Sequence, residues 1–330
     1  MKLRVNRNFL KVMAGIAGVI CLLISFFLLL HAWEVKESQV NLPETDRDSI
    51  TWNGVKYLQR KDLDTILIMG LDKFEDTEES GKYLNHQQAD FMVLLAVDRK
   101  TKTYSVLHLN RDTMTDISVL GERGERVGTV NEQLALSHTY GTGGKDSCRN
   151  SVEAVSNLLH GVKIDHFLSM TMDAVAILND YAGGVTVEVL DDFSEIDPSL
   201  VQGEIITLKG PQALTYVRTR KNLEDSSNLH RMERQRQYLT ALREQVESKR
   251  QKDPEFLAKA LAKAADYLVS DVTVNQMSAI SEKIDGYTFN GFRTLDGEAV
   301  KGDKYMEYYV DKDALMETVL ELYFKPKEYF

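Results

Sequence analysis

Three short apolar runs place the tightest limit on how this 330-residue chain can fold. They read TILIMGLD at 65–72, FMVLLAV at 91–97 and YSVLHL at 104–109. Apolar runs of this length are typical of strands that are buried on both faces of a sheet. The turn DRKTK separates the second run from the third, which predicts that these two strands are antiparallel neighbours.

Helical and strand patterns alternate along the rest of the chain. Strands are expected at 166–172 and 185–190, and a pair of strands at 287–295 and 305–310. Helices are expected at 130–139, 146–159, 173–181, 229–249, 255–268, 274–284 and 313–324. No linker rich in Pro, Gly or Ser divides the region. We therefore expect one α/β (α+β) domain in which helices flank a mixed central β-sheet.

The N-terminal region has the pattern of a membrane anchor. Four basic residues in 1–11 precede an uncharged apolar run from Val12 to Trp33, which is long enough to span a bilayer as a helix. The basic flank predicts a cytoplasmic N-terminus. A cleavable signal peptide is the alternative, but its apolar core usually has only about 7–15 residues. We expect a single-pass anchor at 12–33, a stalk at 34–60 and an extracytoplasmic domain at 61–330.

Charge and cysteine content limit the partners of that domain. The chain has a formal net charge of −10, and setting aside the four basic residues before the anchor leaves −14 on the remainder. So acidic a domain is a poor nucleic-acid binder, and we expect no nucleic-acid partner. Cys21 lies in the apolar run, so Cys148 has no external cysteine to pair with and is interpreted as a small buried residue.

Arginine is concentrated between Tyr216 and Gln237. Arg218 and Arg220 are two residues apart, which in a strand would place both side chains on one face. A second group has the i, i+3, i+4 spacing of one helix face and consists of Arg231, Arg234 and Gln235.

Guanidinium groups bind phosphate and carboxylate with two parallel hydrogen bonds. The arginine stretch therefore predicts an anion pocket built from a strand end and the following helix. The alternative is a solvated helix face, on which the arginines pair with nearby acidic residues. Those residues are Glu224, Asp225 and Glu233.

Charged residues also occur at the ends of the three apolar runs. Asp72 ends the first run, Asp90 directly precedes the second, and Arg111 and Asp112 follow the third. Ligands of open α/β sheets bind at strand ends. Two carboxylates near an arginine cluster fit Mg²⁺ with a polyphosphate, because Mg²⁺ prefers oxygen ligands. Each residue taken alone could instead cap a loop or form a local turn pair. The chain has no GxxxxGK[ST], HExxH, CxxC or GxSxG motif for another chemistry.

Taken together, these segments resemble the LytR-CpsA-Psr family. The similarity covers the anchor and about 64–246, with a looser C-terminal tail. The segments that carry it are, in chain order, ILIMGLD, QADFMVLLAVD, SVLHLNRDT, YAGGVTVEV, LKGPQALTYVRTR and RMERQRQYL. One departure concerns Asn228, which stands where the family often has an Asp three residues before the first helix arginine.

The resemblance implies a membrane-bound, extracytoplasmic phosphotransferase with its catalytic domain at 61–330 and a C-terminal extension from about 250. Its substrate would be a glycopolymer of the wall teichoic acid or capsular polysaccharide type on a polyprenyl-pyrophosphate carrier, and its acceptor peptidoglycan. By position, Asp72 and Asp90 match ligands of Mg²⁺ (or Mn²⁺). The residues matching pyrophosphate contacts are Arg111, Arg218, Arg220, Arg231, Arg234 and Gln235.

We expect Arg111, Arg218 and Arg220 to contribute to catalysis, with Asp112 or Asp225 as the general base. Two alternatives remain open. The same site could act as a pyrophosphatase with water as acceptor, or the protein could be a non-enzymatic envelope regulator or lipid-binding protein. A DNA-binding regulator is disfavoured by the expected anchor and by the acidic external domain.

Overall fold

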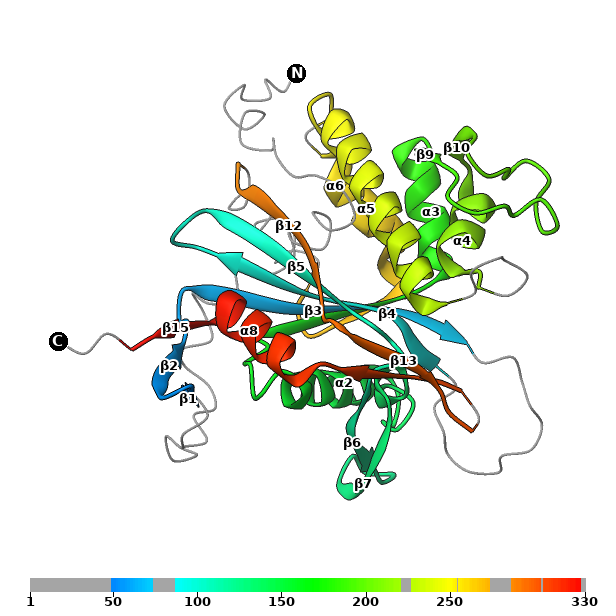
Figure 1. Ribbon diagram of the computed structural model, residues 1–330. Helices are drawn as coiled ribbons and strands as arrows, with labels where there is room; N and C mark the ends of the chain where they lie inside the picture. Colours follow the sequence, from blue (N-terminus) through cyan, green and yellow to red (C-terminus); the bar gives the residue numbers. More distant parts are fainter. Residues whose placement is uncertain are drawn as a thin grey trace. The chain divides into compact units, whose positions relative to one another are not determined.

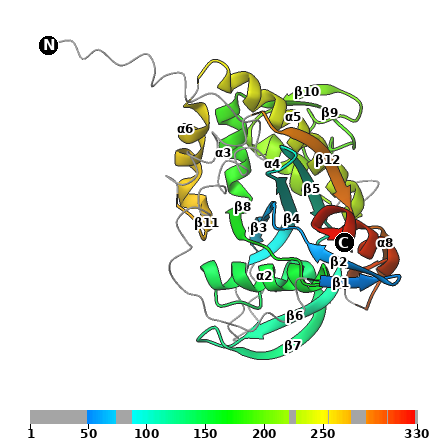
Figure 2. The ribbon, with the colours of Figure 1, turned by 90° about the vertical axis from the view of Figure 1, so that its left-hand side faces the viewer.

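The computed structural model describes residues 49–73, 87–220, 227–253, 255–273, 286–303 and 305–327. They form two compact units (Figures 1 and 2). The sheet unit comprises the described residues of 49–169, 269–271 and 288–327, and the helical unit those of 170–268 and 272–287. The expected anchor at 12–33 lies outside the described residues, and among the helices that are described none is long and apolar enough to cross a membrane.

A mixed six-stranded sheet, built largely from the sheet unit, confirms the predicted fold class (Figure 1). β4 is antiparallel to both β3 and β5, which confirms the predicted antiparallel pairing of the second and third apolar runs, whereas β12 pairs with β5 in parallel. Consecutive residues Ile66 and Leu67 point to opposite faces and are both 0% exposed, so the sheet is buried on both sides. In spatial order the strands are β11 (Leu268–Ser270), β8 (His166–Thr171), β3 (Leu63–Lys73), β4 (Gln87–Asp98), β5 (Thr103–Leu109) and β12 (Thr288–Thr294).

The predicted pairing of 287–295 with 305–310 is wrong. The first segment forms β12 on the edge of β5, where Phe289 stacks on Tyr104 with ring centroids 5.0 Å apart. The second forms β14 (Met306–Val310), which pairs with β13 (Gly297–Lys301). Both segments are strands, as expected. The local sequence does not show that the edge of β5 is open for pairing with β12.

The helix expected at 130–139 is also wrong over most of its length. Residues up to Gln133 belong to β7 (Arg126–Gln133), which forms a hairpin with β6 (Met114–Leu120). Only a short 3-10 turn, η3 (Leu134–Ser137), follows. Pairing with β6 overrides the weak local helical preference of this stretch.

Two helices pack with one face of the sheet, α2 (Gly144–Leu158) and α8 (Lys312–Tyr323), and both confirm predicted helices. Figure 2 shows α2 running beside the β6–β7 hairpin. One buried cluster joins Leu67 of β3, Val155 of α2 and Val319 of α8. A small antiparallel sheet completes the unit and consists of β1 (Ser49–Trp52), β2 (Val55–Gln59) and β15 (Phe324–Pro326).

The helical unit contains α3 (Asp173–Ala182), α4 (Gly210–Arg218), α5 (Asn228–Arg250), α6 (Phe256–Ala264) and η4 (Ala265–Tyr267), with the hairpin β9 (Val185–Glu188) and β10 (Ile205–Leu208). These elements confirm the helices expected at 173–181, 229–249 and 255–268 and the strand at 185–190. Gly183 ends α3 in the left-handed region at φ 93°, a conformation that favours glycine. The helix expected at 274–284 lies outside the described residues.

Candidate functional site

The predicted metal ligands and Arg111 lie at one edge of the central sheet. Because β4 is antiparallel to β3 and β5, the end of β3, the start of β4 and the end of β5 meet there. Asp72 is the penultimate residue of β3 and lies directly opposite Gln88 of β4. Residues opposite each other in a sheet have Cβ atoms about 5 Å apart, so their side chains are neighbours on one face.

Asp90 occupies a β-bulge rather than the position before a strand. β4 begins at Gln87, four residues earlier than the apolar run, because the strand continues past the apolar core to the sheet edge. Gly70 pairs with Phe91 and Leu71 with Ala89, which leaves Asp90 as the extra residue. A bulge redirects one side chain of a strand and is common next to functional sites.

Arg111 connects the side chains of this edge. Its Nε lies 3.2 Å from Asp90 Oδ1 and 3.6 Å from Asp112 Oδ1, and its Nη2 donates a hydrogen bond to Gln88 Oε1. The Arg111 side chain is only 8% exposed and that of Asp90 14%. The arrangement fixes a nearly buried guanidinium between two acidic residues.

Hydrogen bonds fix both the side chain and the backbone of Asp112. Its Oδ1 accepts a hydrogen bond of 3.0 Å from Gln133 Nε2, and its backbone N–H donates to Asn110 Oδ1 at 3.0 Å. Tyr308 N–H donates to the Asp112 carbonyl oxygen at 2.9 Å, which ties this turn to β14. Asp112 is therefore a positioned, 4% exposed residue beside Arg111.

A buried histidine supports the first residue of β4, and sequence reasoning missed it. His138 Nδ1 and Thr139 Oγ1 both lie 3.1 Å from the carbonyl oxygen of Gln87, the neighbour of Gln88. Burial lowers the pKa of His138 to about 4, although the hydrogen bond to Gln87 opposes the shift. The neutral ring can therefore act as a fixed N–H donor. Its position after a short turn, with no charged motif around it, gave no signal in the sequence.

Cys148 is a buried residue that contacts His138. Its Sγ is 3.3 Å from Ser169 Oγ and 3.9 Å from His138 Nε2, and the residue is 0% exposed. Burial raises the pKa of the thiol to about 11, so the reactive thiolate is suppressed. The interpretation of Cys148 as a small buried residue is confirmed.

The oxygen-rich edge around Arg111 fits a small divalent cation. Three carboxylates, of Asp72, Asp90 and Asp112, accompany one guanidinium, so the local charge is negative. Among the described residues no group of three or more His, Cys, Asp or Glu side chains is arranged as a complete metal cage. Mg²⁺ commonly uses only one or two carboxylates and takes its other ligands from phosphate and water. Asp72 and Asp90 match that pattern.

The second set of predicted residues belongs to the helical unit, and one expectation about it is wrong. Arg218 is the exposed last residue of α4, not a strand residue. Thr219 is extended and Arg220 is half-buried. Pro211 in the first turn favours helix initiation, and the helix then continues to Arg218. The two arginines therefore do not share a strand face but flank a helix end.

The predicted shared face of Arg231, Arg234 and Gln235 is confirmed, and it is buried. They are 2%, 1% and 4% exposed, so they do not form a solvated surface. Arg234 pairs through Nη1 with Asp191 and donates through Nη2 to the carbonyl oxygen of Thr219. Its guanidinium carbon also lies 5.1 Å from the ring centre of Phe193.

Arg234 and Gln235 together hold the end of α4. Gln235 Nε2 donates a 3.0 Å hydrogen bond to the carbonyl oxygen of Val217, and Arg234 binds that of Thr219. These two carbonyls flank Arg218. Asp191 carries the opposite charge, and its other oxygen lies 3.1 Å from His230 Nδ1. Asp191 is far from the arginine stretch in sequence, so sequence reasoning did not identify it.

Asn228 takes the place of the expected aspartate and orients Arg231. Its Oδ1 accepts hydrogen bonds from Arg231 Nε at 3.0 Å and from Arg231 Nη2 at 2.6 Å. Ser227 begins the helix by accepting from His230 N–H at 3.2 Å. A neutral amide thus positions the guanidinium without neutralising its charge.

The structure therefore brings the predicted residues together in two clusters, one in each unit. The sheet unit holds Asp72, Asp90, Arg111 and Asp112, and the helical unit holds Arg218, Arg220, Arg231, Arg234 and Gln235. Asp225, the other candidate base, lies outside the described residues.

Known proteins are similar to this chain in sequence and in fold. The chain is 31% identical over 185 residues to "Polyisoprenyl-teichoic acid--peptidoglycan teichoic acid transferase TagU" of Halalkalibacterium halodurans, covering 56% of this chain and 54% of that protein. The chain thus spans about half the length of that relative. It is 25% identical over 292 residues to "Polyisoprenyl-teichoic acid--peptidoglycan teichoic acid transferase TagV" of Bacillus subtilis, covering 83% of this chain and 68% of the relative.

The crystal structure of B. subtilis TagV has the same fold, with a TM-score of 0.58 at 23% identity, covering 79% of this chain and 97% of that one. The LytR_cpsA_psr family model matches residues 29–322, which is most of the chain. With the sheet edge around Arg111 and the buried arginine face of α5, this match establishes that the chain belongs to the LytR_cpsA_psr family.

Proposed function

We propose that this protein is an extracytoplasmic phosphotransferase. It moves a glycopolymer of the wall teichoic acid or capsular polysaccharide type from a polyprenyl-pyrophosphate carrier to peptidoglycan. The observation that carries the proposal is family membership over residues 29–322, together with the activity in the names of the TagU and TagV relatives. The charge of both clusters supports it, since a metal–pyrophosphate substrate needs carboxylates and guanidiniums.

In this proposal the arginines bind the pyrophosphate. Arg218, Arg220 and Arg231 contact its oxygens and stabilise the charge that develops on the leaving group. Arg234 and Gln235 act on the same substrate through the end of α4, because Arg234 pairs with Asp191 and both side chains bind the carbonyl oxygens that flank Arg218.

Asp72 and Asp90 are the proposed ligands of Mg²⁺ (or Mn²⁺). When bound, the cation would neutralise part of the pyrophosphate charge, which lowers the barrier to attack by a nucleophile. Arg111 is fixed next to Asp90 by the 3.2 Å ion pair and can contact the same phosphate group.

The proposed reaction exchanges one phosphorus–oxygen bond for another. A hydroxyl oxygen of a peptidoglycan sugar attacks the phosphorus attached to the polymer, and the bond from this phosphorus to the bridging oxygen breaks. Polyprenyl phosphate leaves with the electron pair, held by the guanidiniums. The hydroxyl proton passes to a carboxylate, either Asp112, which is fixed by Gln133, or Asp225.

Arginine substitutions test the site. Arg218→Ala and Arg220→Ala should each lower polymer transfer from a lipid-linked substrate by on the order of a hundredfold, because each removes one preorganised charge contact. Arg149→Ala, at an exposed arginine of α2, is the matched control and should leave transfer unchanged. Near-wild-type transfer in both site variants would refute the assignment.

Product analysis separates transfer from hydrolysis. The proposal predicts polymer covalently attached to peptidoglycan and released polyprenyl phosphate. Free polymer phosphate without attached polymer would instead indicate a pyrophosphatase.

Asp90→Asn should reduce transfer and weaken its dependence on Mg²⁺ concentration, whereas an unchanged metal dependence would remove Asp90 from the metal site.

We also propose that residues 12–33 anchor the protein in the cell membrane, with the N-terminus in the cytoplasm and the remainder outside. Protease added to intact cells without their wall should then digest the C-terminal region. Complete protection of that region would contradict this topology.

A further inference from the structure

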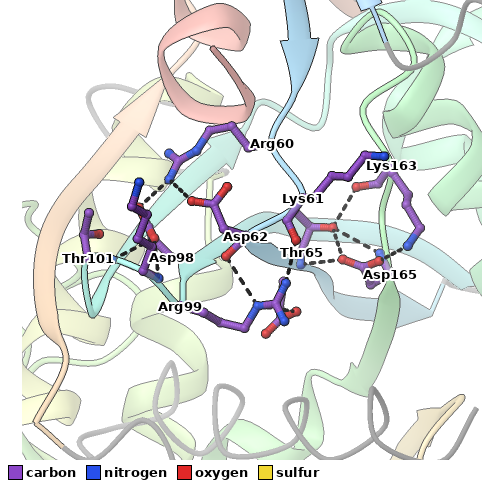
Figure 3. Close-up of polar contacts among 11 residues, drawn as sticks. Arg60, Lys61, Asp62, Thr65, Asp98, Arg99, Thr101, Lys163 and Asp165 are labelled. Atoms are coloured by element: carbon purple, nitrogen blue, oxygen red, sulfur yellow. Dashed lines mark hydrogen bonds and ion pairs between the residues drawn. The ribbon is translucent and has the colours of Figure 1, made fainter.

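A polar pocket lies at the other end of β3 from the candidate site. It has a volume of about 290 Å³ and is lined by Gln59, Arg60, Lys61, Leu63, Thr65, Lys163 and Asp165. Seven residues of strand separate Thr65 from Asp72, which corresponds to about 24 Å at 3.4 Å per residue. Figure 3 shows Arg60, Lys61, Thr65, Lys163 and Asp165 of this lining with the hydrogen bonds and ion pairs around them. We call this feature the Arg60 pocket.

The carboxylates around the Arg60 pocket are engaged by internal partners. Asp165 Oδ2 accepts from Thr65 N at 3.0 Å, and Asp165 Oδ1 lies 2.5 Å from Lys163 Nζ. Asp98 accepts from Arg60 Nη2 and from the backbone N–H groups of two residues of the following turn, Lys100 and Thr101. Asp62 also pairs with Arg60 Nη2 at 3.2 Å, and Asp64 Oδ1 lies 3.4 Å from Arg99 Nε.

The pocket groups that can still form hydrogen bonds are donors on cationic side chains. Arg60 bonds both of its acidic partners through Nη2, so its Nη1 and Nε groups are not used in those pairs. Lys163 Nζ carries three hydrogens and pairs with the carboxylate of Asp165. The Lys61 side chain makes no hydrogen bond or ion pair with any described residue, whereas its carbonyl oxygen accepts from Arg99 Nη2 at 2.6 Å.

We propose that the Arg60 pocket binds an oxyanion, a phosphate or carboxylate group, through Arg60, Lys61 and Lys163. Guanidinium and ammonium donors bind such groups with charge-assisted hydrogen bonds. The volume is several times the roughly 30 Å³ that one water occupies, so an oxyanion fits with part of its hydration shell. The oxyanion could belong to a free anion, to an anionic polymer or to a lipid headgroup. The site does not depend on the proposed transferase activity.

A local NMR readout tests the proposal without interference from the arginines of the helical unit. The full-length protein in detergent micelles is labelled with ¹⁵N on lysine side chains, and Lys61→Gln assigns the Lys61 signal. Titration with inorganic phosphate should shift the Lys61 and Lys163 signals along one saturable curve. The signal of Lys312, an exposed lysine of α8, should stay in place.

Two variants of the pocket are expected to change its affinity for phosphate in opposite directions. Lys61→Gln should weaken phosphate binding, followed at Lys163, by about tenfold, the loss expected for one charge-assisted hydrogen bond. Asp165→Asn should strengthen it severalfold, because Lys163 loses its competing carboxylate. Lys312→Gln is the matched control and should have no effect. The proposal is overturned if Lys61 moves no more than Lys312, or if Asp165→Asn weakens binding.

The source of the oxyanion is identified by repeating the titration with two further probes. Tighter binding of a short glycerol phosphate oligomer than of inorganic phosphate would indicate a polymer. A Lys61-dependent gain on phosphatidylglycerol vesicles would indicate a lipid headgroup, and equal affinity for all probes a small free anion. Failure of all three probes to shift Lys61 would refute the site, whatever the outcome of the transfer assay.

Discussion

At the residue scale, neutral side chains position the charged ones. His138 and Thr139 bind the carbonyl of Gln87, and Asn228 binds Arg231 with one amide oxygen. Such groups hold a charged neighbour or its backbone in place without cancelling its charge. Arg111 and Arg234 differ, because their partners include carboxylates.

The buried state of His138 makes a pH-dependent contribution to stability. Its pKa of about 4 in the folded protein lies below the ordinary value of 6.5, so the unfolded chain binds the proton first as the pH falls. Stability from this group is complete above about pH 6.5 and is lost between 6.5 and 4. The loss is on the order of 3 kcal/mol. Urea unfolding at several pH values should show a smaller slope in His138→Gln, and an equal slope would contradict the assignment.

Asn228 should affect transfer only through Arg231. Asn228→Ala removes two hydrogen bonds to a 2% exposed guanidinium, and we expect transfer to fall about tenfold. Combined with Arg231→Ala it should cause little further loss. Asn228→Asp should restore the position of Arg231 but raise KM for the lipid-linked substrate, because it adds a competing carboxylate. Additive losses in the double variant would show that Asn228 acts independently.

At the element scale, the arginine-bearing end of α4 is fastened by α5. The side chains of Arg234 and Gln235 bind the carbonyls of Thr219 and Val217, and Asp191 neutralises Arg234. In the sheet unit, the bulge at Asp90 similarly turns one residue of β4 toward Arg111.

Loss of the Arg234 guanidinium should lower the free energy of unfolding substantially. Arg234→Ala would leave the 5% exposed carboxylate of Asp191 without its guanidinium, and removing one partner of a buried ion pair costs about 3–5 kcal/mol. His230 remains near Asp191, so we expect the lower end of this range. Urea unfolding measures the change, and the double variant with Asp191→Asn should recover part of it. A loss below about 1 kcal/mol would show that the pair contributes no more to stability than an exposed ion pair.

At the scale of the whole molecule, each unit is assembled from segments that are distant in sequence. The sheet unit takes β12 and α8 from the C-terminal part of the chain, the part expected as an extension. Val319 and Tyr323 of α8 are both 0% exposed in the cluster that contains the central strands.

Removal of the C-terminal elements should therefore disrupt the sheet unit. Deletion of 288–330 exposes the edge of β5 and the buried cluster, and the truncated chain should lose cooperative thermal unfolding. Val319→Ala is a milder perturbation of the same buried cluster and should lower the free energy of unfolding by about 2 kcal/mol. Glu317→Ala, at an exposed position of the same helix, should change stability by less than about 0.5 kcal/mol. Wild-type unfolding of the truncated chain would contradict this role.

The sequence by itself determined the features that depend on local pattern. Apolar runs identified β3, β4 and β5, and helical spacing identified the common face of Arg231, Arg234 and Gln235. The same runs placed Asp72, Asp90 and Arg111 at strand ends.

Only the tertiary structure decided the features that need a partner from elsewhere in the chain. These include the parallel pairing of β12 with β5, the bulge at Asp90, and the pairing of Arg234 with Asp191. The physical reason is that periodicity reports which face of an element is buried, whereas hydrogen-bond and charge partners are set by packing between distant segments.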